Sequence, residues 1–142
     1  MTDHVSTHQA EEDARNENIL IWVDGQLKPK ASAVVSVYDS GFMLGDGVWE
    51  GIRLYNGKWT FLDEHLDRLF EAAKAIDLDI GRTRDQVAAA VMETQAANGM
   101  VTDAHARLMV TRGVKTRPFQ HPRLSQQGPT MVIIMEHSRQ KL

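Results

Sequence analysis

The chain has 142 residues, a net charge of −3 and a pI near 6.0, and 42% of its residues are hydrophobic. This size fits one domain with a buried core, and the charge argues against a broad basic surface for nucleic acid. The absence of cysteine excludes disulfides, a thiolate nucleophile and a zinc ribbon. There is no apolar run long enough for a membrane span and no signal-peptide pattern in the first 18 residues. These features predict a cytoplasmic protein without nucleic-acid or membrane partners.

The first 18 residues differ in composition from the rest of the chain. They hold five acids and one base, and Val5 is their single branched aliphatic residue. A segment with so little to bury is expected to be a disordered acidic leader over residues 1–18. The folded domain is expected over residues 19–137, and residues 138–142 are expected to begin a linker to a further domain.

Two hairpins are predicted in the first half of the domain. The apolar run over 19–23 ends at Asp24-Gly25, a dipeptide typical of tight hairpin turns. The run over 48–55 is followed by Asn56-Gly57, which favours a type I′ turn and a returning strand over 58–62.

Two helices follow. Apolar residues recur at helical spacing over 62–76, and Asp63 is expected to cap this helix at its start. Thr83 and Gln86 stand in capping-box register at the start of the second helix, which is expected to stop at Asn98-Gly99.

Three further strands are predicted over 33–37, 106–110 and 130–135, and a long loop rich in proline and basic residues occupies 111–129. Loops longer than about 12 residues usually carry function. The order of the elements predicts an α+β fold, in which an antiparallel sheet built from hairpins forms one layer and the two helices pack on it as a second layer.

The residues alone give little evidence of a catalytic site. The histidines show no metal-binding spacing, so no metal site is predicted. The segment from Gly41 to Gly51 lacks the glycine order of a nucleotide-binding loop. We interpret the acids Asp39, Asp46 and Glu50 as solvated or capping groups rather than as a catalytic pair.

Two ordered motifs carry a family resemblance. The first, DSGFMLGDGVWEGIR, runs from Asp39 to Arg53, and the second, EHLDRL, runs from Glu64 to Leu69, with VTRG ending at Gly113 as a further match. From about residue 19 onward the chain resembles the N-terminal domain of the class IV (fold-type IV) pyridoxal-phosphate enzymes. This family includes branched-chain and D-amino-acid aminotransferases, (R)-selective amine transaminases and aminodeoxychorismate lyase.

The resemblance implies pyridoxal 5′-phosphate as the cofactor and Arg68, in the HxxRL motif, as the residue that binds its phosphate. Physical chemistry agrees with this role, because a guanidinium presents a planar fork of donors that matches phosphate oxygens. The alternative is an exposed helix arginine that pairs with Glu64 one turn earlier.

The resemblance leaves two arginines open for the substrate carboxylate. Branched-chain enzymes usually carry a tyrosine and an arginine where this chain has His105 and Arg107. D-amino-acid enzymes use a loop arginine, here Arg117, together with a histidine where this chain has Phe119. Trp49 corresponds to an aromatic residue that lines the pocket. The chain departs from both patterns, so either Arg107 or Arg117 could bind the carboxylate.

In the family, the lysine that forms a Schiff base with the cofactor lies in a second domain, and none of the six lysines here has that context. We therefore expect the N-terminal part of a homodimeric transaminase, which moves an amino group between an amino acid or amine and a 2-oxo acid. The chain alone is expected to be inactive. The alternatives are an aminodeoxychorismate-lyase-like enzyme and a non-catalytic dimerisation fragment. A missing domain is also expected to leave an apolar patch exposed on residues 42–44 and on the strand over 130–135.

Overall fold

The structure, a computed structural model, describes residues 13–119, 121, 123 and 128–139. Its main element is a six-stranded antiparallel sheet with the strand order β2-β1-β6-β5-β3-β4. The strands are β1 (Leu20–Val23), β2 (Gln26–Pro29), β3 (Gly47–Tyr55), β4 (Lys58–Trp59), β5 (Ala104–Thr111) and β6 (Thr130–His137). The central strand β5 pairs along its whole length with β3 on one side and β6 on the other.

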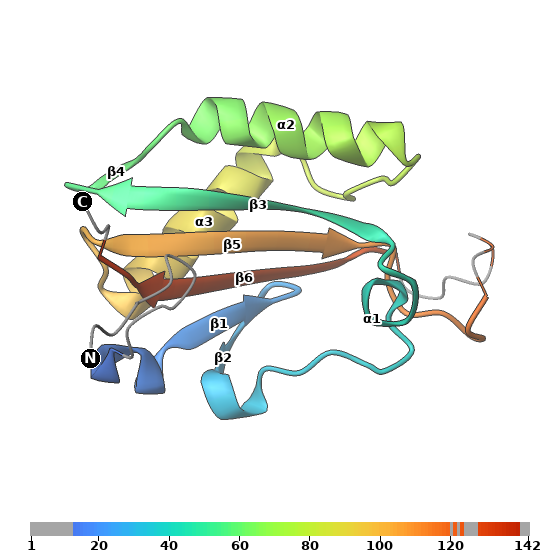
Figure 1. The fold of residues 1–142 in the computed structure, drawn as a ribbon, viewed down its shortest axis with the longest axis horizontal. Helices are drawn as coiled ribbons and strands as arrows, with labels where there is room; N and C mark the ends of the chain where they lie inside the picture. The colour runs from blue at the N-terminus through green and yellow to red at the C-terminus, as the bar shows by residue number, and fades with distance from the viewer. Residues whose placement is uncertain (1–12, 120, 122, 124–127, 140–142) are drawn as a thin grey trace, which may run out of the picture.

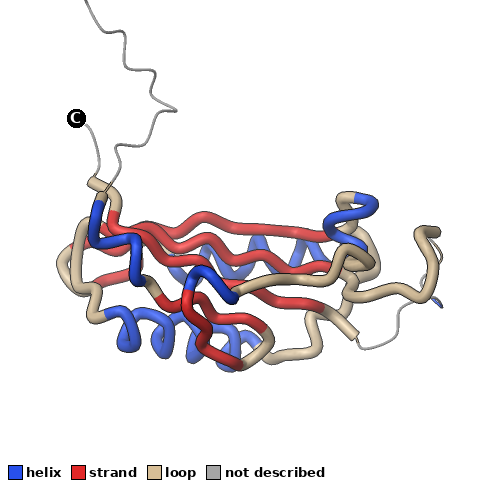
Figure 2. The backbone as a smooth tube through the Cα atoms, turned by 90° about the horizontal axis from the view of Figure 1, so that it is seen from below, coloured by secondary structure: helices blue, strands red, loops and turns tan. Residues whose placement is uncertain are grey.

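Two long helices, α2 (Leu62–Ala75) and α3 (Arg84–Asn98), lie on one side of the sheet (Figure 2). Helix α2 runs beside β3, and α3 packs on β1 and β6 (Figure 1). The shorter helices are α1 (Ser40–Leu44), at one end of the sheet, and the 3₁₀ helices η1 (Ala14–Asn18) and η2 (Lys30–Ser32). The expected two-layer α+β fold is therefore confirmed. Within the described residues, no helix has the length and apolar character to cross a membrane.

The hydrophobic core lies between the sheet and the two long helices. Glu50, Ile52 and Leu54 alternate along β3 and are buried toward the helices. Trp49 and Tyr55, at the intervening positions, are exposed on the opposite face of the sheet, which we call the open face. The core is otherwise filled by aliphatic side chains of β5, β6, α2 and α3, including Ala106, Leu108, Met131, Ile133, Leu66, Leu69, Val87 and Val91.

Several local predictions are confirmed. Asn56 and Gly57 both have positive φ, 48° and 76°, as a type I′ turn requires. Thr83 and Gln86 form the expected capping box at the start of α3, and Gly99 ends that helix in the left-handed conformation.

The predicted cap of α2 is wrong. Residue 61, a phenylalanine with φ of 55°, occupies the cap position and makes no side-chain hydrogen bond there, while Asp63 lies inside the first turn. The returning strand of the second hairpin is also shorter than predicted, because β4 ends at Trp59 and the chain turns into the helix by Leu62.

The predicted strand over 33–37 does not form. The Ser36 hydroxyl accepts a hydrogen bond from the backbone N–H of Tyr38, and the Ser36 carbonyl accepts one from the N–H of Asp39. These local hydrogen bonds turn the chain toward α1, so the segment does not pair with another strand. The result is an exposed apolar stretch that includes Val34, Val37 and, on α1, Phe42.

Two other expectations need correction. Residues 14–18 of the expected leader form η1, capped by Asp13, and the Asn16 side chain pairs with both the N–H and the C=O of His137, at 2.7 and 3.0 Å. Residues 1–12 lie outside the described residues. The strand over 130–135 is not an exposed patch: it is part of β6, inside the sheet, and Met131, Ile133 and Met135 are fully buried.

Arg112 ties three segments together just after β5. Its Nε donates to Asp46 Oδ2 at 2.7 Å, and its Nη atoms donate to the carbonyls of Ile76 and Asp77 at 2.6 and 2.9 Å. Asp46 precedes β3, and the two carbonyls follow α2. The next residue, Gly113, has φ of 95°, and a Cβ there would clash with the Gly128 carbonyl. The VTRG segment is thus a structural junction.

We expect Arg112→Met to lower the free energy of unfolding by about 2–3 kcal/mol, because it leaves the partly buried carboxylate of Asp46 without its ion-pair partner. The measurement is chemical denaturation. The control is Arg84→Ala, which removes an exposed arginine that pairs with Asp67 and should change the unfolding midpoint little. Equal effects of the two variants would contradict the structural role of Arg112.

Candidate functional site

A pocket opens along the edge of β3. Because β4 pairs with β3 only at Leu54 and Tyr55, residues 47–53 of β3 have β5 as their ladder partner on one side and no described strand on the other. Helix α2 runs alongside this free edge (Figure 1). The pocket, of about 850 Å³, is lined from both faces of the strand by Trp49, Glu50, Gly51, His65, Arg68, Glu71, Ala72, His105 and Arg107. Its volume is in the range of small-molecule sites.

On the helix side, a buried carboxylate contacts two basic residues of α2. Glu50 Oε1 lies 3.2 Å from Arg68 Nε, and Glu50 Oε2 lies 2.8 Å from His65 Nδ1. Since an ionised carboxylate only accepts hydrogen bonds, His65 Nδ1 carries the proton in this pair. His65 and Arg68 are three residues apart on α2, a spacing that places both on the same helix face.

On the open face, Arg107 stacks on Trp49. The guanidinium carbon lies 4.4 Å from the centroid of the indole ring. The stack restrains the guanidinium beside Trp49, and both residues line the pocket, since a cation is attracted to the face of an aromatic ring. Arg107 pairs in register with Gly51, and Trp49 lies two residues before Gly51 on β3.

His105 lies against Gly51. A Cβ on Gly51 would come within 2.8 Å of His105 Nε2, so the ring occupies the space that a side chain on Gly51 would need. Burial lowers the pKa of His105, and the charges of Arg107 and Arg53 lower it further, while Glu136 on the paired position of β6 acts in the opposite direction. The pocket therefore holds a neutral imidazole at pH 7.

The structure brings three of the four residues predicted from the sequence into one pocket: Arg68, Trp49 and Arg107. Arg117 lies in the loop after β5, where it is exposed and does not line the pocket. Glu50, His65 and His105 were not predicted as site residues. Glu50 had a signal in the sequence, since it is a charged residue in phase with the buried Ile52 and Leu54 of the same strand.

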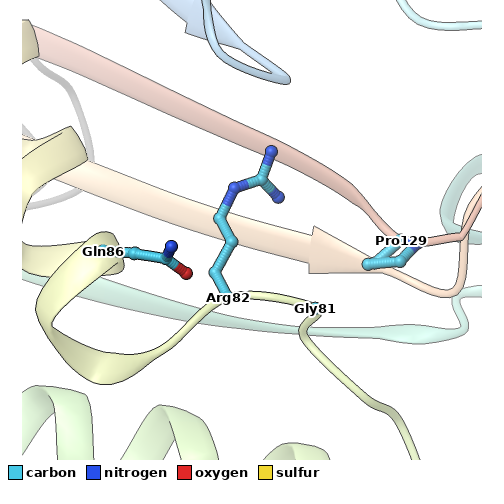
Figure 3. A pocket seen from close by; sticks show the side chains of 4 residues that line it. All are labelled: Gly81, Arg82, Gln86 and Pro129. Atoms are coloured by element: carbon cyan, nitrogen blue, oxygen red, sulfur yellow. The ribbon is translucent and has the colours of Figure 1, made fainter.

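A second depression lies at the start of α3, between Gly81, Arg82, Gln86 and Pro129 (Figure 3). Its polar groups have structural partners. The Arg82 guanidinium lies 5.1 Å from the Trp22 ring, and the Gln86 side chain caps α3. Among the described residues, no group of three or more histidine and acidic side chains is arranged to hold a metal ion.

Comparison with known proteins identifies the family. Residues 47–142 match the family described as amino-transferase class IV, and the chain belongs to this family. It is 42% identical, over 121 residues, to the branched-chain-amino-acid aminotransferase-like protein 1 of Arabidopsis thaliana, which covers 85% of this chain. It is 38% identical, over 101 residues and 71% of this chain, to a D-alanine aminotransferase of Listeria monocytogenes.

A solved structure shows the same fold. The branched-chain aminotransferase of Thermoproteus uzoniensis, crystallised with norvaline, superposes with a TM-score of 0.68 and 31% identity over 84% of this chain. The chain spans 40% of that protein, and 22% and 34% of the Arabidopsis and Listeria proteins. The resemblance to the N-terminal domain of class IV enzymes is thereby confirmed.

We expect His105 to titrate below its ordinary pKa of 6.5. A depressed pKa favours the neutral form in the folded state, so the stability that this form contributes is present above pH 6.5 and is lost as the pH falls through the lowered pKa. The measurement is an NMR pH titration, with His105→Gln to identify the signal. A measured pKa at or above 6.5 would show that burial and the two nearby guanidinium groups do not lower the pKa of His105.

Proposed function

We propose that this chain is the N-terminal part of a pyridoxal-phosphate-dependent transaminase, which moves an amino group between an amino acid or amine and a 2-oxo acid. The observation that carries the proposal is the presence of two arginines, Arg68 and Arg107, in one pocket at the edge of β3. One arginine suits the cofactor phosphate and the other suits the substrate carboxylate.

Arg68 is the residue that would hold the cofactor phosphate. Its side chain is 70% exposed, and apart from the contact of Nε with Glu50 it has no ion pair or hydrogen bond with a described side chain. Its terminal nitrogens are therefore available to an anion, which fits a phosphate group. When bound, pyridoxal phosphate acts as an electron sink for charge that develops on the substrate.

Arg107 is the better supported of the two carboxylate candidates, because it lines the pocket and is held in place by Trp49. The indole ring would form one wall beside the substrate. Arg117 stays a prediction from the sequence. The relatives named above include both branched-chain-like and D-alanine enzymes, so the substrate and its stereochemistry stay open.

The remaining parts of the catalytic site are proposed to come from outside this chain. None of the described lysines lines the pocket. Covalent catalysis on the cofactor needs a lysine at the reacting carbon, so we propose that a further domain supplies it and that these 142 residues alone do not transaminate. The homodimer and the cytoplasmic location stay predictions from the sequence.

The central test is Arg68→Ala in the intact enzyme. A charge-assisted fork contributes roughly 1.5–3 kcal/mol, so we expect the affinity for pyridoxal phosphate to fall by about one to two decades. The fold should change little, because the side chain is exposed. The measurement is a titration of the cofactor into the apo variant. Wild-type affinity in this variant would show that the assignment of Arg68 is wrong.

Arg107→Ala and Arg117→Ala serve as matched controls. Both should bind the cofactor nearly as well as the wild type, and we expect Arg107→Ala to raise KM for carboxylate substrates. Simple amines should be less sensitive to this substitution, because they lack the carboxylate that Arg107 would bind. An increase in KM for Arg117→Ala alone would move the carboxylate site to the loop.

A further inference from the structure

Glu50 is an acid on a buried, otherwise apolar face of β3. It alternates with Ile52 and Leu54, and its side chain is 7% exposed. A buried carboxylate without partners is strongly unfavourable, so its presence depends on the groups that pair with it. Those groups are the two basic residues of the HxxRL motif, His65 and Arg68.

The contacts of Glu50 determine which part of the Arg68 guanidinium is free. The carboxylate contacts Nε, at 3.2 Å, and the two terminal Nη atoms make no hydrogen bond or ion pair with a described side chain, while Arg68 lines the pocket. The other carboxylate oxygen accepts from His65 Nδ1 at 2.8 Å. With both oxygens engaged by residues of one helix face, the carboxylate cannot rotate without losing a contact.

This contact limits the freedom of a long, exposed side chain. Arg68 is 70% exposed and, without Glu50, would sample many rotamers. An ion pair at Nε restricts the orientations that the guanidinium can take. Planar two-point recognition is what distinguishes arginine from lysine as a phosphate ligand.

We propose that Glu50 is the positioning residue of Arg68: it pairs with Nε so that the terminal Nη atoms would be available to the cofactor phosphate, and His65 orients the carboxylate in turn. Glu50 itself does not contact the cofactor. This inference rests on the proposed role of Arg68 and adds the residue that orients its guanidinium.

If Glu50 acted through its charge alone, it would weaken phosphate binding rather than support it. A carboxylate near a phosphate repels it, so removal of the negative charge would tighten phosphate binding if Glu50 acted only through its field. Glu71 is the matched control, because it lines the same pocket and makes no ion pair or hydrogen bond with Arg68. The variants Glu50→Gln and Glu71→Gln therefore remove the same charge. Only the first disrupts the contacts with Arg68 and His65, because the single oxygen of an amide can accept from Nε or from Nδ1 but not from both.

The experiment compares two probes in the intact enzyme, pyridoxamine 5′-phosphate and pyridoxamine, which lacks the phosphate. We expect Glu50→Gln to weaken binding of the phosphorylated probe by about tenfold, as is typical when a supporting group of a ligand site is removed. Binding of pyridoxamine should not change, whereas a general disturbance of the pocket would weaken both probes. Glu71→Gln should bind the phosphorylated probe as tightly as the wild type or more tightly.

A second variant and a double mutant complete the test. Glu50→Asp keeps the buried charge but has a shorter side chain. It should weaken binding of the phosphorylated probe and leave binding of pyridoxamine unchanged. This variant tests the inference even if Glu50→Gln does not fold. In an Arg68→Ala background, Glu50→Gln should have no further effect on that probe, because the two residues act as a unit.

Two results would overturn the inference. If Arg68→Ala weakens binding of the phosphorylated probe and neither Glu50 variant does, Glu50 does not position Arg68, although the proposed function stands. If Arg68→Ala leaves the affinity for this probe unchanged, the proposed role of Arg68 fails, and the role of Glu50 fails with it.

Discussion

The arrangement of the pocket depends on the short pairing between β3 and β4. Because β4 covers only the last two residues of β3, the rest of that strand has a free edge, and a pocket along a free edge can draw residues from both faces of the sheet. Edge strands are usually protected by charged side chains or by a covering helix. Here α2 covers the edge, and the charged residues beside it, Arg68 and Arg107, approach from opposite faces of one strand.

The motifs of the sequence divide into residues that build the junctions and residues that face the pocket. Asp46 and Arg112, from the first motif and from VTRG, join the end of β5 to the start of β3 and the end of α2. Glu50, four residues after Asp46, belongs instead to the pocket. The first motif therefore combines a residue of the junction, Asp46, with a residue that lines the pocket, Glu50.

Hairpins, both long helices and their turn signals could be predicted because they depend on local patterns, such as the capping box at Thr83. The strand over 33–37 could not be excluded locally: its residues favour strands, and it fails because hydrogen bonds of Ser36 turn the chain. Arg68, Trp49 and Arg107 were predicted as site residues from the family resemblance, and all three line one pocket. Glu50 and His105 were not, since their importance depends on contacts between β3, β5 and α2 that no short segment contains.

Solvent exposure separates Trp49, the indole on which Arg107 stacks, from the other two indoles of this protein. Trp22 and Trp59 are 3% and 8% exposed, and their Nε1 atoms donate to Glu93 and Gln95, whereas Trp49 is 59% exposed. Quenchers dissolved in water therefore reach one tryptophan and not the other two. We therefore expect the fluorescence of Trp22 and Trp59 to stay constant when a ligand binds at the pocket, and that of Trp49 to change.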